Sequence, residues 1–394
     1  MPWLHVRPMD SKILFLSDWL RGLDTFSNTC RRHGISRKTG YKWVHRYKTL
    51  GLDGLQEQSR RPKHSPSRIP YTVRQALIAL RKEHPHWGPK KLLPVLANRH
   101  PDWELPSRTA VYNILRAAGL IGMRRRKQRV MPSPKPFAPA SGPNDVWSAD
   151  FKGQFYTKDG ACCYPLTVMD HVSRYLLACH IVKGTRTKDS LKVFKKLFVQ
   201  YGLPRRIRTD NGVPFASRGV GGLSRLSAWW VRLGILPERI EPGKPQQNGR
   251  HERMHRTLKQ ETLRPPAANA RVQQVRFDRF RQTYNEVRPH ESLRQRPPAS
   301  CYRSSQHRMP KRLLPLEYPA HFKRAQVNHN GTIWIDGTNV YLGYLLKGEH
   351  VGLEQIGHEI WEVYFGSTRI CRINKDVKEP IMLKGNHKKC HLCL

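Results

Sequence analysis

The chain has 394 residues, with 71 lysines and arginines against 29 aspartates and glutamates, which gives a formal net charge of +42. A hydrophobic fraction of 38% excludes disorder throughout, and no apolar run approaches the roughly 18 residues of a membrane helix. So large a positive charge predicts a polyanionic partner, of which nucleic acid is the commonest. The first residues lack the features of a signal peptide and eight scattered cysteines are too few for a disulfide scaffold, so we expect a cytoplasmic protein.

Apolar residues follow helical spacing from about residue 11. One helix ends near His33, a short glycine-containing turn follows at 34–36, and a basic helix occupies 37–47. That order is typical of a helix-turn-helix domain, which we place at 1–60, although a small helical bundle without DNA contacts has the same pattern. The residues expected to contact DNA are Arg37, Lys38, Lys42 and Arg46.

A second helical unit is predicted at 70–123, after a basic joint that contains prolines. Ser107 is placed to cap the third helix of this unit, and Arg108 opens that helix, so the unit resembles a second helix-turn-helix domain with Arg108 facing DNA. A linker follows at 124–145, where five prolines forbid a helix. Its basic run favours contact with a phosphate backbone over a plain spacer, and consists of Arg124, Arg125, Arg126 and Lys127.

The pattern changes to strands at residue 146. A strand over 146–155, two further strands, and then helix, strand, helix, strand and helix predict an α/β sheet over 146–300. We expect an antiparallel meander on one side of this sheet and crossover connections on the other. Five short strands separated by turn residues then predict a small all-β, barrel-like domain at 326–376.

The last segment, 377–394, is a basic tail. It contains half of a zinc-site pattern, formed by His387, Cys390, His391 and Cys393. Because the other pair of ligands is missing, we favour a tail without fixed structure and leave zinc binding open.

Three acidic residues of the α/β segment are candidates for chemistry. Asp150 lies inside the first strand, Asp210 ends a later strand, and Glu252 lies in the first turn of a helix behind a glycine-containing loop. A turn-forming role for Asp210 and a helix-end role for Glu252 are the ordinary alternatives. Carboxylate oxygens are ligands that suit Mg²⁺, and two such ions can hold the attacking and leaving oxygens of a phosphodiester exchange.

Several motifs surround these acids and carry a resemblance to a known family. They are WSADF at 147–151, Asp170 with SRY at 173–175, TDNG at 209–212, GKPQQNGRHE at 243–252, LKQE at 258–261, and YNEVRPH at 284–290. With them, the sequence resembles the bacterial insertion-sequence transposases of the DDE superfamily. The catalytic core of that superfamily has the ribonuclease H-like fold of retroviral integrases.

The resemblance implies that Asp150, Asp210 and Glu252 form a catalytic triad and hold two Mg²⁺ ions, with Mn²⁺ as a substitute. It implies double-stranded DNA as the partner, both as element ends and as target, and an oligomer of at least two chains on that DNA. It implies no membrane partner, and places the protein in a bacterial cytoplasm in association with the nucleoid.

One spacing departs from the family pattern. Between Asp210 and Glu252 lie 41 residues, which is more than the closest relatives have. A loop at 218–222 can absorb the excess; otherwise Glu241 or Glu261 becomes the third acid.

Basic residues near Glu252 are expected to contact DNA phosphates, with an ordinary solvated face as the alternative and the role of His255 left open. Arg256 and Lys259 share a helical face with Glu252 and His255, and Lys244 lies in the preceding loop. The Arg-Pro-His run at 288–290 either positions a helix end near the site or packs there, and both interpretations stay open.

The sequence therefore predicts a transposase that binds the ends of a mobile element and cuts and joins DNA strands. One alternative is a decayed or domesticated copy that binds DNA as a repressor. Another is a ribonuclease of the ribonuclease H type, against which two sequence-reading domains argue.

Overall fold

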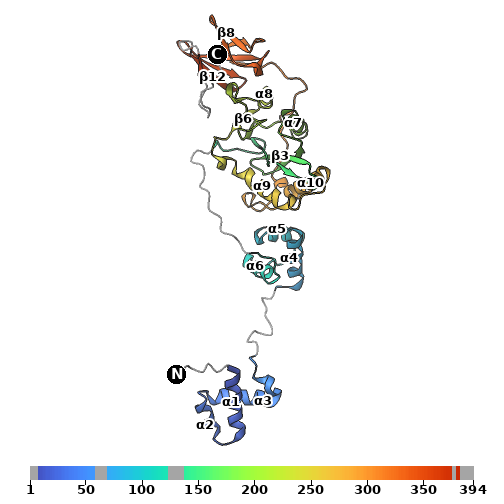
Figure 1. Cartoon of the computed structure of the whole chain (residues 1–394), viewed down its shortest axis with the longest axis vertical. Helices are drawn as coiled ribbons and strands as arrows, with labels where there is room; N and C mark the ends of the chain where they lie inside the picture. Colours follow the sequence, from blue (N-terminus) through green and yellow to red (C-terminus); the bar gives the residue numbers. More distant parts are fainter. Residues whose placement is uncertain (1–7, 58–68, 123–136, 375–378, 382–394) are drawn as a thin grey trace. The chain divides into compact units, whose positions relative to one another are not determined.

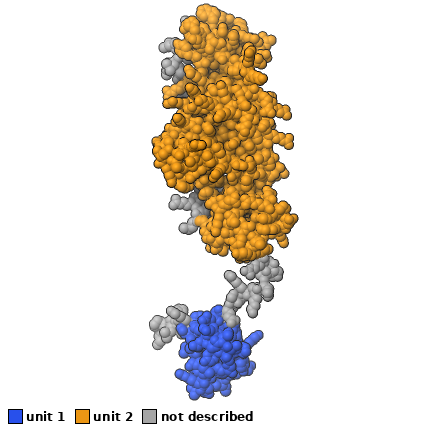
Figure 2. Space-filling model, turned by 90° about the vertical axis from the view of Figure 1, so that its right-hand side faces the viewer, with its two compact units in different colours: residues 1–68 blue, residues 69–394 orange. Residues whose placement is uncertain are grey.

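The computed structural model describes residues 8–57, 69–122, 137–374 and 379–381 (Figure 1). The chain divides into two compact units, 1–68 and 69–394, which Figure 2 draws in different colours. The predicted linker contacts Arg124, Arg125, Arg126 and Lys127 and the cysteine–histidine tail lie outside the described residues. Across the described ranges, no helix combines the length and apolar character needed to cross a membrane.

The first unit is a small helical domain. Its elements are α1 (Pro8–Arg21), α2 (Phe26–Arg32), α3 (Arg37–Leu50) and the short η1 (Gly51–Leu55). Ser36 caps α3 by accepting a hydrogen bond from the Thr39 amide. Gly40 lets α3 approach α2, because a Cβ there would lie 2.6 Å from the Cys30 sulfur. The core buries Phe15, Leu16, Cys30, Trp43, Val44 and Leu55.

A second helical region opens the other unit. It comprises α4 (Tyr71–Glu83), α5 (Pro89–Arg99) and α6 (Arg108–Ala117). Ser107 accepts a hydrogen bond from the Ala110 amide, so the predicted cap of the third helix is present. The helices pack around Val73, Leu77, Leu80, Trp87, Leu92, Leu96, Val111 and Leu115. The predicted division at 1–60, 70–123, 124–145, 146–300, 326–376 and 377–394 stays a prediction.

A six-stranded mixed sheet forms the centre of the second unit. Its strands are β1 (Val146–Phe151), β2 (Phe155–Tyr156), β3 (Cys162–Asp170), β4 (Leu176–Val182), β5 (Arg206–Thr209) and β6 (Leu236–Arg239). The order is β2-β3-β1-β5-β6, and β4 also pairs with β3. The β1, β3 and β4 pairs are antiparallel, whereas β5 is parallel to β1 and β6 to β5, as the sequence predicts. The predicted strand over 146–155 is interrupted, because Gly153 adopts a φ of 87° between β1 and β2.

Helices cover both faces of this sheet. On one face, α7 (Thr187–Tyr201) and α8 (Arg225–Arg232) pack against Trp147, Ala149, Leu166 and Val168. On the other, α9 (Gly249–Thr262) and α10 (Ala270–Glu286) pack against Met169, Leu176 and Cys179. Since side chains alternate between the faces of a strand, Ser148, Asp150 and Thr167 point toward α9. Short helices η3 (Pro245–Asn248), η4 (Glu291–Leu293) and η5 (Pro298–Ser300) complete this region.

The C-terminal region is all-β, as predicted. Strands β7 (Lys323–Gln326), β10 (His350–Gly357), β11 (Ile360–Phe365), β12 (Thr368–Asn374) and β13 (Glu379–Ile381) form an antiparallel sheet in the order β13-β12-β11-β10-β7. β8 (Thr332–Ile335) and β9 (Thr338–Tyr341) form a separate hairpin, with η6 (Tyr344–Leu346) after it. β7 and β13 are strands that the sequence pattern did not predict.

The C-terminal sheet shares a core with the central domain. The loop at 218–222 folds into η2 (Val220–Gly222), and Val220, Leu223 and Val231 are buried in one cluster with Val363 and Ile370. An ion pair of 3.1 Å between the Arg232 guanidinium and the Glu349 carboxylate crosses the same boundary. The extra length between Asp210 and Glu252 therefore provides part of the seat for the C-terminal sheet.

Arg288 connects the second helical region with the central domain. Its guanidinium donates to Glu261 Oε1 at 2.7 Å and to Thr257 Oγ1 at 3.3 Å, and lies 5.8 Å from the centre of the Trp87 ring. The arginine is buried, and Trp87 belongs to the helical core around α4 and α5. Of the two interpretations of this motif, packing accounts for these contacts.

Replacing Arg288 with methionine should destabilise the protein by about 3 kcal/mol, because the Glu261 carboxylate would keep its burial and lose its guanidinium. Urea unfolding followed by tryptophan fluorescence measures the change. A double-mutant cycle with Glu261→Gln should give a coupling of at least about 1 kcal/mol. Lys90→Met, which breaks an exposed pair with Glu291, serves as the control and should leave the midpoint unchanged. If Arg288→Met and Lys90→Met lowered the free energy of unfolding equally, the pair of Arg288 with Glu261 would not act as a buried ion pair.

Candidate active site

The pairing of β1 with β5 decides where the two predicted aspartates lie. The strands run parallel in the register Val146–Arg206, Trp147–Ile207 and Ser148–Arg208. Continuing that register by two residues brings Asp150 level with Asp210. Both residues lie where their strands end, and the carboxyl ends of parallel strands form the edge at which α/β sheets place ligands.

The turn after β5 holds Asp210 in place. The Gly212 amide donates to Asp210 Oδ1 at 3.1 Å, and the Asn211 side-chain amide donates to the Ile240 carbonyl at 2.7 Å. The second bond ties the turn to the end of β6. Asp210 thus forms an Asx-type turn, and that turn also directs its carboxyl toward the strand edge.

Glu252 reaches this edge from α9. Its helix begins behind η3, and Asn248 at the end of η3 donates to Asp150 Oδ2 at 3.4 Å. Arg250 donates to the His171 carbonyl at 3.1 Å, which fastens the first turn of α9 to the loop after β3. Glu252 itself is exposed, and its charge acts on Asp150.

The electrostatics of Asp150 show that the charges of Asp210 and Glu252 act on it. Burial, together with the nearby charges of Asp210 and Glu252, raises the pKa of Asp150 to about 7, and burial is the largest cause. A hydrogen bond from the Phe151 amide and the charge of Lys152 act in the opposite direction. Burial also raises the pKa of Asp210, against the hydrogen bond from Gly212.

The donor set fits a divalent cation. The charges of Asp210 and Glu252 act unfavourably on an ionised Asp150, and a divalent cation would relieve that repulsion. Asp150 Oδ2 lies 3.4 Å from the Asn248 side-chain nitrogen and 3.8 Å from His255 Nδ1. Mg²⁺ and Mn²⁺ both accept oxygen ligands of this kind.

Two histidines and two hydroxyls lie next to Asp150; sequence reasoning left the role of His255 open and missed the other three. His251 and His255 are buried on α9 and meet Thr167 of β3, which pairs directly opposite Asp150. Ser148 of β1 contacts His251. One ligand atom each of Asp150, His251 and His255 lies within 4.8 Å of the others. The helical spacing of the two histidines was a signal, but their strand partners depend on the register of β1 and β3.

The alternative third acids are engaged elsewhere. Glu241 pairs with Lys244 and accepts from the Gln247 side chain at 3.1 Å, while Glu261 pairs with Arg288. Asp170, from the family motif, is fully buried and accepts hydrogen bonds from the Asn144 and Ser173 amides, both at 2.7 Å. Asp170 therefore fastens the turn between β3 and β4.

The predicted DNA-contacting residues differ in exposure. Those exposed on their helices are Arg37, Lys38, Lys42, Arg108, Arg256 and Lys259. Arg46 is partly buried, with its guanidinium 5.2 Å from the centre of the Trp43 ring. Lys244 is partly buried and paired with Glu241, so its first role is to shape the loop before α9.

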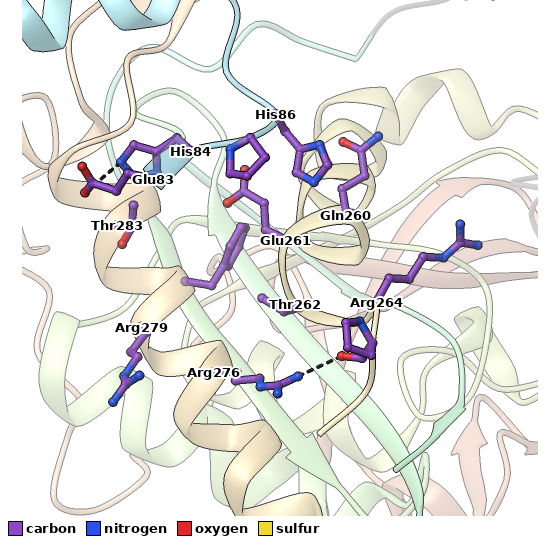
Figure 3. A pocket seen from close by; sticks show the side chains of 13 residues that line it. Glu83, His84, His86, Gln260, Glu261, Thr262, Arg264, Arg276, Arg279 and Thr283 are labelled. Atoms are coloured by element: carbon purple, nitrogen blue, oxygen red, sulfur yellow. Dashed lines mark hydrogen bonds and ion pairs between the residues drawn. The ribbon is translucent and has the colours of Figure 1, made fainter. Parts of the chain in front are cut away.

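A cavity of about 560 Å³ lies at the opposite end of α9 from Glu252 (Figure 3). Its lining combines Glu83 and His84 from the end of α4 with Glu261 and three arginines, Arg264, Arg276 and Arg279. Arg276 donates to the Pro265 carbonyl at 2.8 Å within this wall. Because eight residues of helix span about 12 Å, the cavity is separate from the acidic site.

Comparison with protein families identifies the domains. Two models described as "Integrase core domain" match residues 140–245 and 233–298. A "Helix-turn-helix domain" matches residues 12–63, and a "Homeodomain-like domain" matches residues 39–115. The matches cover the two helical regions and the central sheet.

Two bacterial relatives extend over much of the chain. "Insertion element IS476 uncharacterized 39.2 kDa protein" of Xanthomonas euvesicatoria is 28% identical over 294 residues, or 73% of this chain and 82% of the relative. "Insertion element IS407 uncharacterized 31.7 kDa protein" of Burkholderia multivorans is 32% identical over 194 residues, or 46% of this chain and 64% of the relative.

Solved structures of viral integrases show weaker similarity. The HTLV-2 integrase catalytic core domain in complex with magnesium gives a TM-score of 0.34 at 16% identity, covering 42% of this chain and 99% of the integrase chain. A chain of the simian T-cell lymphotropic virus intasome gives 0.37 at 16% identity, covering 75% and 98%.

The raised pKa of Asp150 predicts a pH dependence of stability. The folded chain holds a proton on Asp150 up to about pH 7, whereas the unfolded chain releases it near its ordinary value of 3.8. The folded state therefore binds more protons between these values, and the contribution of Asp150 to the free energy of unfolding falls as pH rises through this window. Below about pH 4 the contribution of Asp150 to the free energy of unfolding is fully present, and above about pH 7 it is fully lost.

Asp150→Asn should remove this dependence. In the presence of EDTA, the stability of the variant relative to the wild type should increase with pH by up to about 1.4 kcal/mol per unit between pH 5 and pH 7. Urea unfolding at several pH values measures the difference. If the stability difference between Asp150→Asn and the wild type did not change with pH, the pKa of Asp150 would not be raised in the folded chain.

Proposed function

We propose that this chain, which belongs to the transposase/integrase family of insertion-element proteins, is a transposase. It cuts and joins DNA at the ends of a mobile element with the help of divalent cations. The observation that carries the proposal is the parallel register of β1 and β5, which brings Asp150 and Asp210 to one sheet edge. The family membership alone would leave open whether this chain keeps a working site.

The helical regions are the proposed DNA readers. On α3, Arg37, Lys38 and Lys42 are exposed, while Trp43 and Val44 on the same helix are buried in the domain core. Helix α6 repeats this arrangement, with Arg108 exposed and Val111 buried. Each helix thus has one face fixed by packing and one basic face available to a phosphate backbone or a DNA groove.

Asp150, Asp210 and Glu252 are the proposed catalytic and metal-holding residues. When bound, two Mg²⁺ or Mn²⁺ ions would supply the positive charge that stabilises the attacking and leaving oxygens of a phosphodiester exchange. Asp150 and Asp210 are held rigidly by strand and turn, whereas Glu252 lies at the start of a helix behind a loop. The two aspartates therefore define the position of the site, and Glu252 closes it.

The proposed chemistry consists of two exchanges at phosphorus. In cleavage, a water oxygen bonds to phosphorus, the bond from phosphorus to the 3′ oxygen breaks, and that oxygen leaves as a 3′-hydroxyl. In joining, the freed 3′ oxygen bonds to a target phosphorus, and the 3′ oxygen of the target strand leaves. Arg256 and Lys259, exposed one and two turns beyond Glu252, are placed to hold the DNA backbone during both exchanges.

Two features weigh against the alternatives. A ribonuclease acting on hybrid duplexes has no need of two basic reader helices, and the helix-turn-helix matches precede the integrase core in this chain. A decayed copy that acts only as a repressor has no need to keep Asp150 and Asp210 level at the ends of paired strands. We also propose that at least two chains act together, because two element ends must be held at once.

Asp210→Asn should abolish cleavage and joining while end binding is kept or becomes slightly stronger, since the change removes one negative charge with little change of shape. Labelled element ends with Mg²⁺ or Mn²⁺ measure strand cleavage and joining, and a gel shift measures binding. Glu286→Gln removes an equal charge from the exposed side of α10 and should leave both activities unchanged. Strand joining by the Asp210→Asn protein would reduce this residue to a turn-former and refute the proposal.

Binding of element ends should weaken steeply with salt. Arg37→Ala and Arg108→Ala in the full chain should each lower the slope of log affinity against log salt by about 0.9 if they remove one phosphate contact. Lys188→Ala, which removes an exposed lysine of α7, is the control and should not change the slope. Equal affinity of the wild type for end and random DNA would argue against sequence reading by these helices.

A further inference from the structure

A hydrogen-bonded network connects α9 to the two strands below Asp150. Thr167 Oγ1 lies 2.7 Å from His251 Nε2, 2.6 Å from His255 Nε2 and 3.0 Å from the Asp150 carbonyl oxygen. His251 Nδ1 lies 2.8 Å from Ser148 Oγ. The four side chains are buried, so each hydrogen bond has to be satisfied within the network.

The network constrains which nitrogen of each imidazole carries the proton. The Thr167 hydroxyl has one hydrogen, and only one of its three neighbours, the Asp150 carbonyl and the two Nε2 atoms, can accept it. We assign that hydrogen to the Asp150 carbonyl, so that both Nε2 atoms donate to Thr167 Oγ1. Both rings are buried, and the carboxylate contact of His255, at 3.8 Å, is beyond hydrogen-bond distance, so we take each ring as neutral with one N–H. Each Nδ1 therefore presents a lone pair.

The two Nδ1 lone pairs meet different partners. The Ser148 hydroxyl lies 2.8 Å from His251 Nδ1 and 3.3 Å from the Met169 carbonyl, and we assign its one hydrogen to the shorter contact. The lone pair of His255 Nδ1 faces Asp150 Oδ2 at 3.8 Å, which is beyond hydrogen-bond distance. When the Asp150 carboxyl is ionised, two electron-rich atoms thus face each other, and this arrangement is unfavourable unless a cation lies between them.

The separation of 3.8 Å suits two ligands of one ion. Two atoms that are each about 2.1 Å from an ion lie between about 3.0 Å and about 4.2 Å apart, for ligand angles from a right angle to a straight line. We propose that His255 Nδ1 is a further metal ligand, which shares one divalent ion with Asp150. This inference rests on the metal dependence in the proposed function and adds a nitrogen to its ligand set.

His251 has a different role, because both of its ring nitrogens are occupied. It is a positioning residue, which connects Ser148 of β1 through Thr167 of β3 to His255 on the next turn of α9. The network fixes the distance between α9 and the sheet. Glu252, one turn before His255, therefore lies toward the same edge as Asp150.

A nitrogen ligand alters which ion the site prefers. Mg²⁺ favours oxygen ligands and keeps its waters, whereas Mn²⁺ accepts imidazole and carboxylate together. Mn²⁺ should therefore bind the full-length protein at least about tenfold more tightly than Mg²⁺ in the absence of DNA. Pulsed electron paramagnetic resonance of bound Mn²⁺ should show coupling to a ¹⁴N nucleus.

Two substitutions separate coordination from positioning. In His255→Asn, the side-chain oxygen takes the place of Nδ1 and the donor to Thr167 is lost. In His255→Gln, the side-chain NH₂ takes the place of Nε2 and keeps that donor, while the Nδ1 ligand is lost. Thermal unfolding in EDTA checks that both variants fold, and Asp150→Asn provides the reference for loss of the ion.

Calorimetric titration of Mn²⁺ and Mg²⁺ into the full chain gives the result. For a ligand role, His255→Gln should lose about ten- to a hundredfold in Mn²⁺ affinity and the ¹⁴N coupling. His255→Asn should keep ion binding, with its preference shifted from Mn²⁺ toward Mg²⁺. Wild-type Mn²⁺ affinity in His255→Gln, or loss of binding in His255→Asn alone, would overturn the inference in favour of positioning through Thr167.

The outcome is separable from that of the proposed function. If the wild type cleaves and joins DNA with metal and His255→Gln binds Mn²⁺ as the wild type does, the ligand role of His255 fails and the transposase proposal stands. If Asp210→Asn still joins strands, the transposase proposal fails whatever the titrations of the His255 variants give.

Discussion

The parallel pairing of β1 with β5 is the contact on which the candidate site depends. Trp147 and Ile207 are paired across it and are both fully buried against α7 and α8, so hydrophobic packing on one face sets the register. The opposite face and the strand ends then receive the polar residues in fixed positions. Asp150 and Asp210 are level because Trp147 and Ile207 are level, and a slip of one residue would turn Asp150 toward the hydrophobic core.

The acids with little exposure lie in different electrostatic settings. Glu362 is matched with Arg369 and Arg372, both at 2.7 Å. That pairing holds the pKa of Glu362 at about 2 despite the opposing effect of burial. Asp150 instead has acids and neutral imidazoles around it, and its pKa moves in the opposite direction. This setting, in a chain with a net charge of +42, is the one in which we propose that cations bind.

The segment between Asp210 and Glu252 serves two parts of the molecule. It carries α8 and β6, which complete the central sheet, and η2, which packs under the C-terminal sheet. Gly221 has a φ of 62°, and a Cβ there would lie 2.9 Å from Ile370, so the contact with β12 requires this glycine. The Arg239 guanidinium, from β6, donates to the Gly221 carbonyl at 2.8 Å. The unusual spacing of the acids is therefore a consequence of how the C-terminal sheet is attached.

Local sequence determined the elements and the residue types of this protein. Ser107 before a helix, the strand alternation from 146 onward and the Asp-Asn-Gly turn at 210–212 each depend on neighbours in the chain, and each has the predicted local structure. Asp150 was found because a carboxylate in a core strand is anomalous by itself, whereas Asp210 and Glu252 were singled out by their combination with it and by the family motifs. The strands β7 and β13 were not found, because short strands with charged residues have little signal until they pair with a sheet.

The tertiary structure alone decided what these residues do together. Thr167 is an ordinary strand residue until the β1–β3 register sets it opposite Asp150, and His251 and His255 are ordinary helix residues until α9 lies on that face. Nor does the chain order reveal that Arg288 will bind Glu261 and lie over Trp87, a residue 201 positions earlier. The physical reason is that local preferences act over one turn or one strand, whereas hydrogen bonds and charges in the site act over a few ångströms of space between distant segments.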